Sequence, residues 1–170
     1  MEGRSVTAGQ LGCPVCGRTY QVRDGAVDFG GAPDWSQASE TALDAAAVNA
    51  LTGLHGPGGY LTLVGSAASL WREVAELNPG VALVAVNPAA GVGDAPGASV
   101  LRAGRLPLKS GSMRGVVLGR RYGTEPDWVN DAARVVLPGL RVVGEGPNPS
   151  PDIIDLMASA DGVWVGTKKR

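Results

Sequence analysis

Two cysteines, Cys13 and Cys16, have the spacing of a metal-binding knuckle. They lie in the segment CPVCG, whose proline and glycine suit the tight turn of such a knuckle. One CxxC pair supplies two of the four thiolate or imidazole ligands that Zn²⁺ prefers. The single histidine, His55, follows a predicted helix, and nothing in the sequence places it near the cysteines. We therefore expect no bound metal in one chain, and zinc only with ligands from another chain.

No other group of residues has a pattern typical of catalysis. The sequence contains no HExxH, no GxxxxGK[ST] phosphate loop and, with a single histidine, no evident Ser–His–acid set. Many group transfers need only proximity, so a missing base by itself excludes little. We nevertheless predict no catalytic residue, and we favour a protein that is not an enzyme.

A basic segment between residues 95 and 124 is a candidate binding surface. It carries six basic residues and no acidic one, whereas the first 60 residues carry six acids and three bases. Such a run is most often a solvated face; as a functional surface it would dock an acidic protein, phospholipid headgroups or RNA. No aromatic platform accompanies the charges, which disfavours single-stranded nucleic acid. The candidate partner-binding residues are Arg102, Arg105, Lys109, Arg114, Arg120 and Arg121, with Trp35 as an exposed aromatic anchor.

The composition bounds the class of protein. The chain has 170 residues, of which 44% are hydrophobic, and a net charge of −1, which excludes a globally basic nucleic-acid binder. No apolar run approaches the ~18 residues of a membrane span, and the first ten residues lack the apolar centre of a signal peptide. Two cysteines fit a reducing cytosol. We expect a cytoplasmic protein, either free or peripheral on the cytoplasmic side of a membrane complex.

The elements that would position these residues follow from the hydrophobic pattern. Residues 11–29 alternate apolar and polar side chains around the turn signal Asp24-Gly25, which predicts short strands. A helix capped by Ser36 or Ser39 and stopped by Gly53 comes next. Buried runs separated by helices then indicate an α/β fold, with a mostly parallel sheet and helices on both faces. The expected strands are 60–65, 81–86, 99–103, 114–118, 140–143 and 163–165, and the expected helices are 66–77, 127–136 and 152–160.

Three blocks between residues 54 and 146 carry a family resemblance. They read LTLVGSAAS, VLRAGRLPLKSGSMRGVVLG and VNDAARVVLPGLRVVGEG. This region resembles the class I S-adenosylmethionine-dependent methyltransferases. The resemblance implies a Rossmann-like parallel sheet of strand order 3-2-1-4-5, here truncated after strand five plus one helix and one strand. It would place the cofactor against Gly65, Ser66 and Asn87, with Leu106 near the adenine.

Departures from the family pattern gather at the implied cofactor site. Ala67 and Ser69 stand where the family has glycines, and an alanine methyl would crowd a ligand that must approach the backbone. Asn87 replaces the ribose-binding acid, and the lost charge assistance is worth on the order of 1 kcal/mol. Thr62 stands where the pattern has an acid, the acid beside the adenine is replaced by Arg102 or Ala103, and the Phe-Asp that begins the fourth strand is Met113-Arg114. We therefore interpret the chain as a degenerate methyltransferase and expect no cofactor, or S-adenosylmethionine only if the site is an unusual working one.

Residues 12–29 carry a second resemblance. They are similar to the second half of a small zinc ribbon, as found in methyltransferase activators and as an N-terminal appendage of some methyltransferases. The ribbon pattern has two CxxC knuckles and this chain has one, Cys13 with Cys16, which implies a remnant. We divide the chain into a zinc-ribbon-like remnant with its linker, 1–33, and a methyltransferase-like α/β domain, 34–170.

These features favour a non-catalytic methyltransferase-like protein that serves as a structural or regulatory subunit of a larger protein assembly. It would dock through the basic segment, the knuckle or a sheet edge, because the truncated order leaves an edge strand unpaired. Two alternatives stay open: an active S-adenosylmethionine-dependent methyltransferase with an atypical cofactor site, and a zinc-ribbon module completed by a partner chain. The partner assembly would be cytoplasmic or membrane-associated, presenting an anionic or acidic surface, and neither nucleic-acid binding nor a membrane span is expected.

Overall fold

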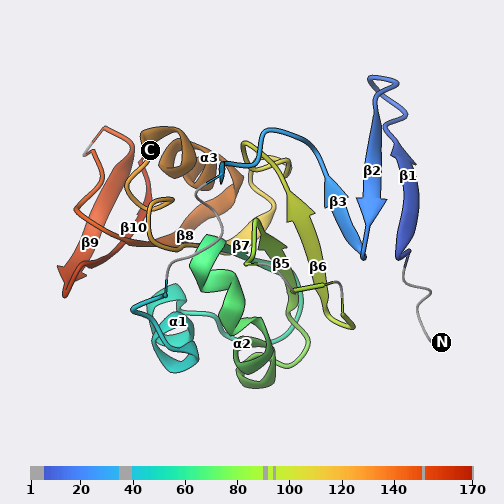
Figure 1. The fold of residues 1–170 in the computed structure, drawn as a ribbon. Helices are drawn as coiled ribbons and strands as arrows, with labels where there is room; N and C mark the ends of the chain where they lie inside the picture. The colour runs from blue at the N-terminus through green and yellow to red at the C-terminus, as the bar shows by residue number, and fades with distance from the viewer. Residues whose placement is uncertain (1–5, 35–39, 90–91, 94, 151, 170) are drawn as a thin grey trace.

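Five parallel strands form the centre of the sheet (Figure 1). The computed structural model describes residues 6–34, 40–89, 92–93, 95–150 and 152–169. The five strands stand in the spatial order β6-β5-β4-β7-β8, which is the predicted order 3-2-1-4-5. Their bounds are β4 (Tyr60–Val64), β5 (Ala82–Val86), β6 (Ala98–Arg102), β7 (Met113–Leu118) and β8 (Val136–Glu145). The α/β class is thereby confirmed.

The carboxyl-terminal end of the chain adds an antiparallel pair to this sheet. Strand β10 (Val163–Lys168) pairs with β8 on one side and with β9 (Ile154–Ala160) on the other. The predicted helix over 152–160 is therefore wrong, and so is the predicted truncation of the sheet. The turn explains the difference, because Asp161 and Gly162 both have positive φ angles (53° and 75°), as a two-residue hairpin turn requires.

The N-terminal strands extend the same sheet at its other end. Strands β1 (Ala8–Gly12), β2 (Thr19–Arg23) and β3 (Ala26–Asp28) form an antiparallel meander, and β3 then pairs in parallel with β6. The predicted Asp24-Gly25 turn is confirmed, with φ angles of 50° and 75°. The result is one ten-stranded sheet in the order β1-β2-β3-β6-β5-β4-β7-β8-β10-β9.

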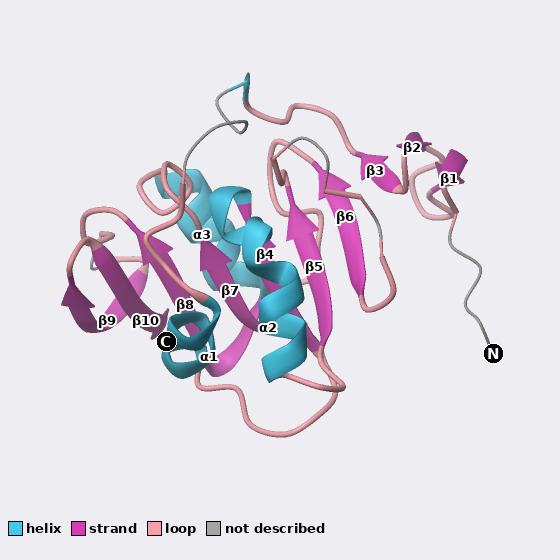
Figure 2. Ribbon diagram, turned by 60° about the horizontal axis from the view of Figure 1, so that its bottom comes forward, coloured by secondary structure: helices cyan, strands magenta, loops and turns pink. Residues whose placement is uncertain are grey.

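Helices cover both faces of the central strands. Helices α1 (Ala45–Thr52) and α2 (Trp71–Leu77) pack on one face, where Figure 2 shows α2 lying across the central strands, and α3 (Pro126–Val135) packs on the other. Side chains of β4 alternate between the two cores, Leu63 facing α1 and α2 and Val64 facing α3.

Two details of the helices differ from the predictions. Asp44 caps α1, its side chain accepting from the Ala47 N–H, whereas the predicted caps Ser36 and Ser39 lie outside the described residues. The helix predicted over 66–77 begins as a 3₁₀ helix, η2 (Gly65–Leu70), before α2. The early 3₁₀ turn matters because it brings the backbone after β4 close to the neighbouring loops.

Candidate functional site

The centre of the carboxyl edge of the sheet is where a ligand is expected in this topology. After β4, the next two strands, β5 and β6, are added on one side of β4. The following strands, β7 and β8, are added on its other side, so the strand order reverses at β4. Open α/β sheets bind ligands in the crevice at such a switch point, outside the carboxyl ends of the strands. The four residues predicted to contact a cofactor all follow these ends: Gly65 and Ser66 after β4, Asn87 after β5 and Leu106 after β6.

The side chain of Tyr122 fills the space above Gly65. Gly65 has a φ of 63°, and a Cβ atom built on it would collide with the Tyr122 ring. The ring is 1% exposed and packs edge-on against Trp128, with the two ring centroids 4.6 Å apart. Tyr122 belongs to the turn after β7, so this turn and the turn after β4 meet face to face.

The same two turns also meet through Ser66. A Cβ atom on Gly119, just after β7, would collide with the Ser66 side chain and the Ala67 backbone. The Arg120 N–H donates to the Ser66 hydroxyl at 3.2 Å. The crevice between the strands on either side of the switch point is therefore closed by direct contact of its two walls.

Asn87 is fully buried and is bound to the end of the neighbouring strand. Its Nδ2 donates to the Ala103 carbonyl at 2.7 Å, and its Oδ1 accepts from the Ala103 N–H at 2.8 Å. Asn87 has a φ of 50°, a left-handed conformation that asparagine tolerates better than most residues. Its amide thus acts as one more rung between β5 and β6. Leu106 is also buried, and its N–H donates to Asp131 at 2.9 Å.

A buried carboxylate, Glu145, was missed by the sequence-based reasoning. It is the last residue of β8 and is 1% exposed. Its carboxylate accepts hydrogen bonds from five neutral donors, which belong to three segments of the chain. Its Oε2 accepts from the Arg120 N–H at 2.8 Å and from the Ser66 hydroxyl at 3.4 Å. Its Oε1 accepts from the Thr41 hydroxyl and from the backbone N–H groups of Ala42 and Leu43. Glu145 therefore joins the segment before α1 to the closed crevice.

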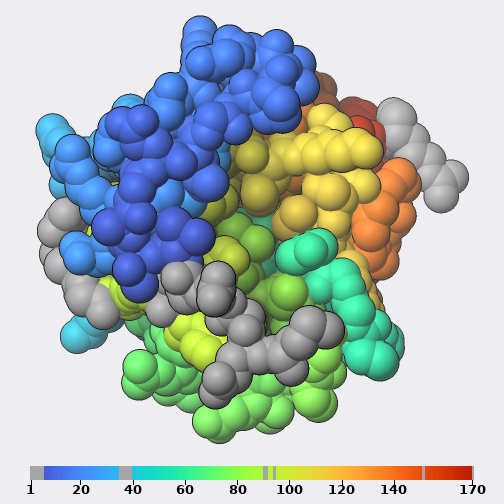
Figure 3. Space-filling view, turned by 90° about the vertical axis from the view of Figure 1, so that its right-hand side faces the viewer, coloured from blue at the N-terminus to red at the C-terminus, as the bar shows by residue number. Residues whose placement is uncertain are grey.

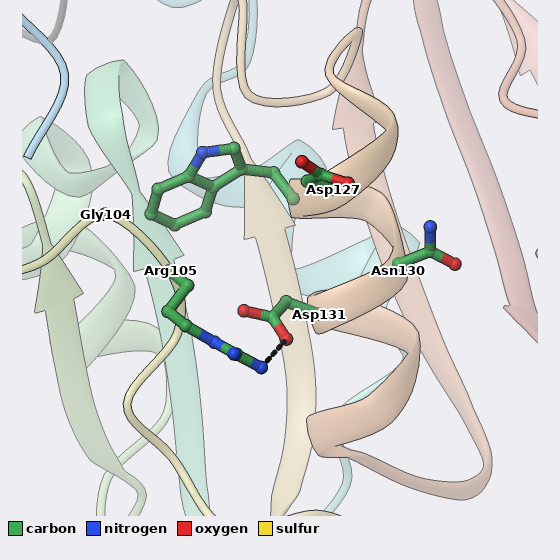
Figure 4. Close-up of a pocket in the computed structure, with 6 residues that line it drawn as sticks. Gly104, Arg105, Asp127, Asn130 and Asp131 are labelled. Carbon is green, nitrogen blue, oxygen red and sulfur yellow. Dashed lines mark hydrogen bonds and ion pairs between the residues drawn. The ribbon is translucent and has the colours of Figure 1, made fainter. Parts of the chain in front are cut away.

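A surface cavity of about 470 Å³ lies beside α3 (Figure 4). Its lining residues are Gly104, Arg105, Asp127, Trp128, Asn130 and Asp131. Arg105 and Asp131 point toward one another and form an ion pair of 3.3 Å, and Arg134 donates to the same Asp131 oxygen at 2.9 Å. The charge of Asp131 is already matched by these two arginines, so the cavity offers hydrogen bonding rather than a free carboxylate.

The candidate partner-binding residues lie at two opposite edges of the sheet. Arg102 is the last residue of β6, and Arg105 follows it closely. Arg120 and Arg121 follow β7, so all four residues lie at the carboxyl edge of the sheet. Lys109 and Arg114 lie at the amino end of β7. The Arg114 guanidinium donates to the backbone carbonyls of the 55–58 loop, at 2.6 to 2.9 Å for the carbonyls of His55, Gly56 and Gly58. Trp35 lies outside the described residues.

The cysteine pair lies in the turn between β1 and β2. The backbone N–H groups of Cys16 and Val15, and the Cys16 thiol, hydrogen-bond to the Cys13 sulfur and lower the pKa of Cys13 from its ordinary value of 9.0. Both thiols are free. Within the described ranges, no three or more histidine, cysteine or acidic side chains gather as a metal site. The described helices also include none that is long and apolar enough to cross a membrane.

Known proteins resemble this chain in fold rather than in sequence. The sequence matches no known protein family and no curated protein. Among solved structures, the pyocyanin biosynthetic protein PhzM aligns over 75% of this chain and 55% of its own, with a TM-score of 0.54 and 14% identity. A proposed S-adenosylmethionine-dependent methyltransferase of Methanococcus maripaludis aligns over 74% of this chain and 84% of its own, with a TM-score of 0.53 and 9% identity.

A third neighbour is the geranyl diphosphate C-methyltransferase of Streptomyces coelicolor A3(2), with a TM-score of 0.51 and 15% identity. It aligns over 59% of this chain but only 41% of its own length, so this chain spans less than half of that enzyme. The fold is therefore that of the class I S-adenosylmethionine-dependent methyltransferases. At these identities the likeness establishes the fold alone, and activity must be argued from the site.

Proposed function

We propose that this chain is a non-catalytic protein of the methyltransferase fold, which serves as a structural or regulatory subunit of a larger protein assembly. The observation that carries the proposal is the pairing of Asn87 with Ala103, at 2.7 and 2.8 Å. In the family pattern this position holds the ribose of the cofactor. Here both functional ends of the amide are bound to backbone, and the side chain is fully buried.

The contacts around Gly65 support the same conclusion. A glycine turn serves a nucleotide because a ligand can approach its backbone closely. At Gly65 the approach is made by the Tyr122 ring, a part of the protein itself. A cofactor would have to displace a buried aromatic ring, and removing such a ring from its core costs about 3–5 kcal/mol.

Calorimetric titration with S-adenosylmethionine and with S-adenosylhomocysteine tests the proposal. We expect no heat of binding for the wild-type chain up to millimolar ligand. Tyr122→Ala serves as the companion variant, because it empties the space over Gly65 while leaving the Asn87 pair in place. Micromolar binding by the wild type would contradict the proposal and would direct attention to finding a methyl acceptor.

The sheet edge at β9 supports the role as a subunit. Leu156 and Met157 are 44% and 53% exposed on this outermost strand. An unpaired edge with exposed apolar side chains is a ready site for association with another chain. We expect the native protein to migrate in an assembly larger than the purified chain. The double variant Leu156→Lys, Met157→Lys should migrate at the mass of the purified chain, whereas Leu77→Lys, an equally exposed position on α2, should not change migration.

A further inference from the structure

The turn between β1 and β2 holds its two thiols in a fixed arrangement. The Cys13 N–H donates to the Arg18 carbonyl at 2.8 Å, and the Gly17 N–H donates to the Cys13 carbonyl at 2.9 Å. Gly17 has a φ of 68°, a conformation that glycine adopts without strain. Cys13 and Cys16 stand three residues apart in this backbone-bonded turn, and both thiols are free. The turn therefore offers two candidate metal ligands.

The pair could supply two ligands of a zinc site, and within the described ranges it is not part of any group of three or more histidine, cysteine or acidic side chains. Structural zinc takes four thiolate or imidazole ligands in a tetrahedron. His55 precedes β4 at the amino edge of the sheet, whereas the β1–β2 turn lies beyond the carboxyl edge, because β2 runs antiparallel to β3. The 170 residues contain no third cysteine. Two further ligands are needed to complete the tetrahedron.

We propose that Cys13 and Cys16 form one half of a zinc site that is completed by the same two cysteines of a second copy of this chain. Two copies related by a two-fold axis supply four thiolates. Because each copy uses the same surface, such an interface forms a dimer and does not extend to further copies. Each thiol releases its proton to solvent as the sulfur binds Zn²⁺. The four thiolates and the ion leave two negative charges, and Arg18 lies two residues after Cys16 in each copy.

The surface beside the thiols suits a second copy. All five residues of β1 are exposed, and so are the apolar side chains of Leu11, at 44%, and Val15, at 93%. Figure 3 shows the N-terminal hairpin forming the outer surface at this end of the molecule, and Figure 1 shows its turn standing away from the helices. We expect two such turns to meet with little contact between the helices of the two copies. Apolar side chains beside the thiols would be covered by their own counterparts.

The test is the metal content and the mass of one sample of the full chain, purified under reducing conditions with zinc and then freed of excess metal. We expect about half a zinc per chain, as four thiolates per ion require, in a protein of dimer mass. A chelator should remove the zinc and convert the dimer to monomer together. Cobalt in place of zinc should give the charge-transfer absorption of a tetrahedral site with four thiolates.

Two variants show whether these cysteines bind the zinc and join the two copies. The double variant Cys13→Ser, Cys16→Ser should be monomeric and free of zinc, with the far-ultraviolet circular dichroism of the parent. His55→Ala is the matched control, and it should keep both the zinc and the dimer mass. One zinc per monomer, no zinc at all, or a dimer that persists in the double serine variant would each overturn the proposal. The titration with S-adenosylmethionine is independent of all three results.

Discussion

The crevice at the centre of the sheet and the hairpin turn at its N-terminal end are the two places where the sequence led us to look for a ligand. In the centre, Asn87, Ser66 and Glu145 are buried or half-buried, and their polar atoms are bound within the protein. In the hairpin, Cys13 and Cys16 have free thiols near the surface. A ligand binds most readily where polar groups are not already bonded within the protein. The polar side chains of Asn87, Ser66 and Glu145 are so bonded, whereas the two thiols are free.

The two regions should also differ in how much the fold depends on them. A buried polar group that loses its partner keeps the full penalty of its desolvation, about 1–3 kcal/mol for each group. An exposed side chain that is changed leaves water to satisfy whatever remains. The comparison therefore predicts large losses of stability for changes at the centre and small ones at the hairpin.

The largest effect is expected at Glu145. Glu145→Ala removes the acceptor of five donors, among them the backbone N–H groups of Ala42, Leu43 and Arg120. With several donors left buried, we expect the free energy of unfolding to fall by about 4 kcal/mol. Urea unfolding followed by tryptophan fluorescence measures this loss. Glu145→Gln keeps the shape and one acceptor oxygen, and it should lose clearly less. Equal losses in the two variants would show that packing, rather than hydrogen bonding, holds this residue.

The next effect is expected at Asn87, and it tests whether the cofactor pattern can be restored. Asn87→Asp reintroduces the acid of the family pattern but places a carboxylate oxygen against the Ala103 carbonyl, where Nδ2 now donates at 2.7 Å. Aspartate tolerates a positive φ much as asparagine does, so the substitution leaves the backbone conformation at this position unstrained. We expect a loss of about 2–3 kcal/mol in the free energy of unfolding. The variant should still give no heat with S-adenosylmethionine, and micromolar binding would show that the crevice opens more easily than its contacts indicate.

The central sheet could be predicted from the sequence because its signals are local. Strands β4 and β5 are uninterrupted buried runs, and the turn Asp24-Gly25 has its expected conformation. Strand β9 was missed because a proline followed by residues 152–160 also fits the start of a helix. The stronger signal was Asp161-Gly162, a two-residue hairpin turn between two short apolar segments. Strand β1, with the sequence AGQLG, has little strand propensity and owes its conformation to pairing with β2.

The candidate site could be placed from the sequence, but its contacts could not. The positions after β4 and β5 follow from the strand ends, so the sequence leads to Gly65 and Asn87. That the Asn87 amide binds Ala103, 16 residues later, depends on how β5 and β6 pair. Glu145 and Thr41 are 104 residues apart and meet only in the folded chain. Such pairings have no periodic pattern, because they are fixed by the tertiary fold.

A substitution at Arg114 should lower the free energy of unfolding by less than one at the crevice and by more than one at the hairpin turn. Its guanidinium donates to all four backbone carbonyls of the 55–58 loop, a geometry that the single ammonium group of lysine cannot reproduce. Arg114→Lys should lower the free energy of unfolding by about 1 kcal/mol. Arg120→Lys is the control, because the bonds of Arg120 to Ser66 and Glu145 come from its backbone N–H. If both variants lose the same amount in urea unfolding, loss of the carbonyl contacts is not the cause.

The smallest effect on folding is expected at Val15, in the hairpin turn. Its side chain is 93% exposed, so Val15→Ser should change the free energy of unfolding of the metal-free monomer by less than about 0.5 kcal/mol. The same variant keeps both thiols and removes apolar surface beside them. In the presence of zinc it should therefore dissociate at a higher protein concentration than the parent, as measured by analytical ultracentrifugation. If Val15→Ser lowered the free energy of unfolding of the monomer as much as Asn87→Asp does, the contrast between the two regions would be wrong. The stability of the fold would then depend on the hairpin turn as much as on the crevice.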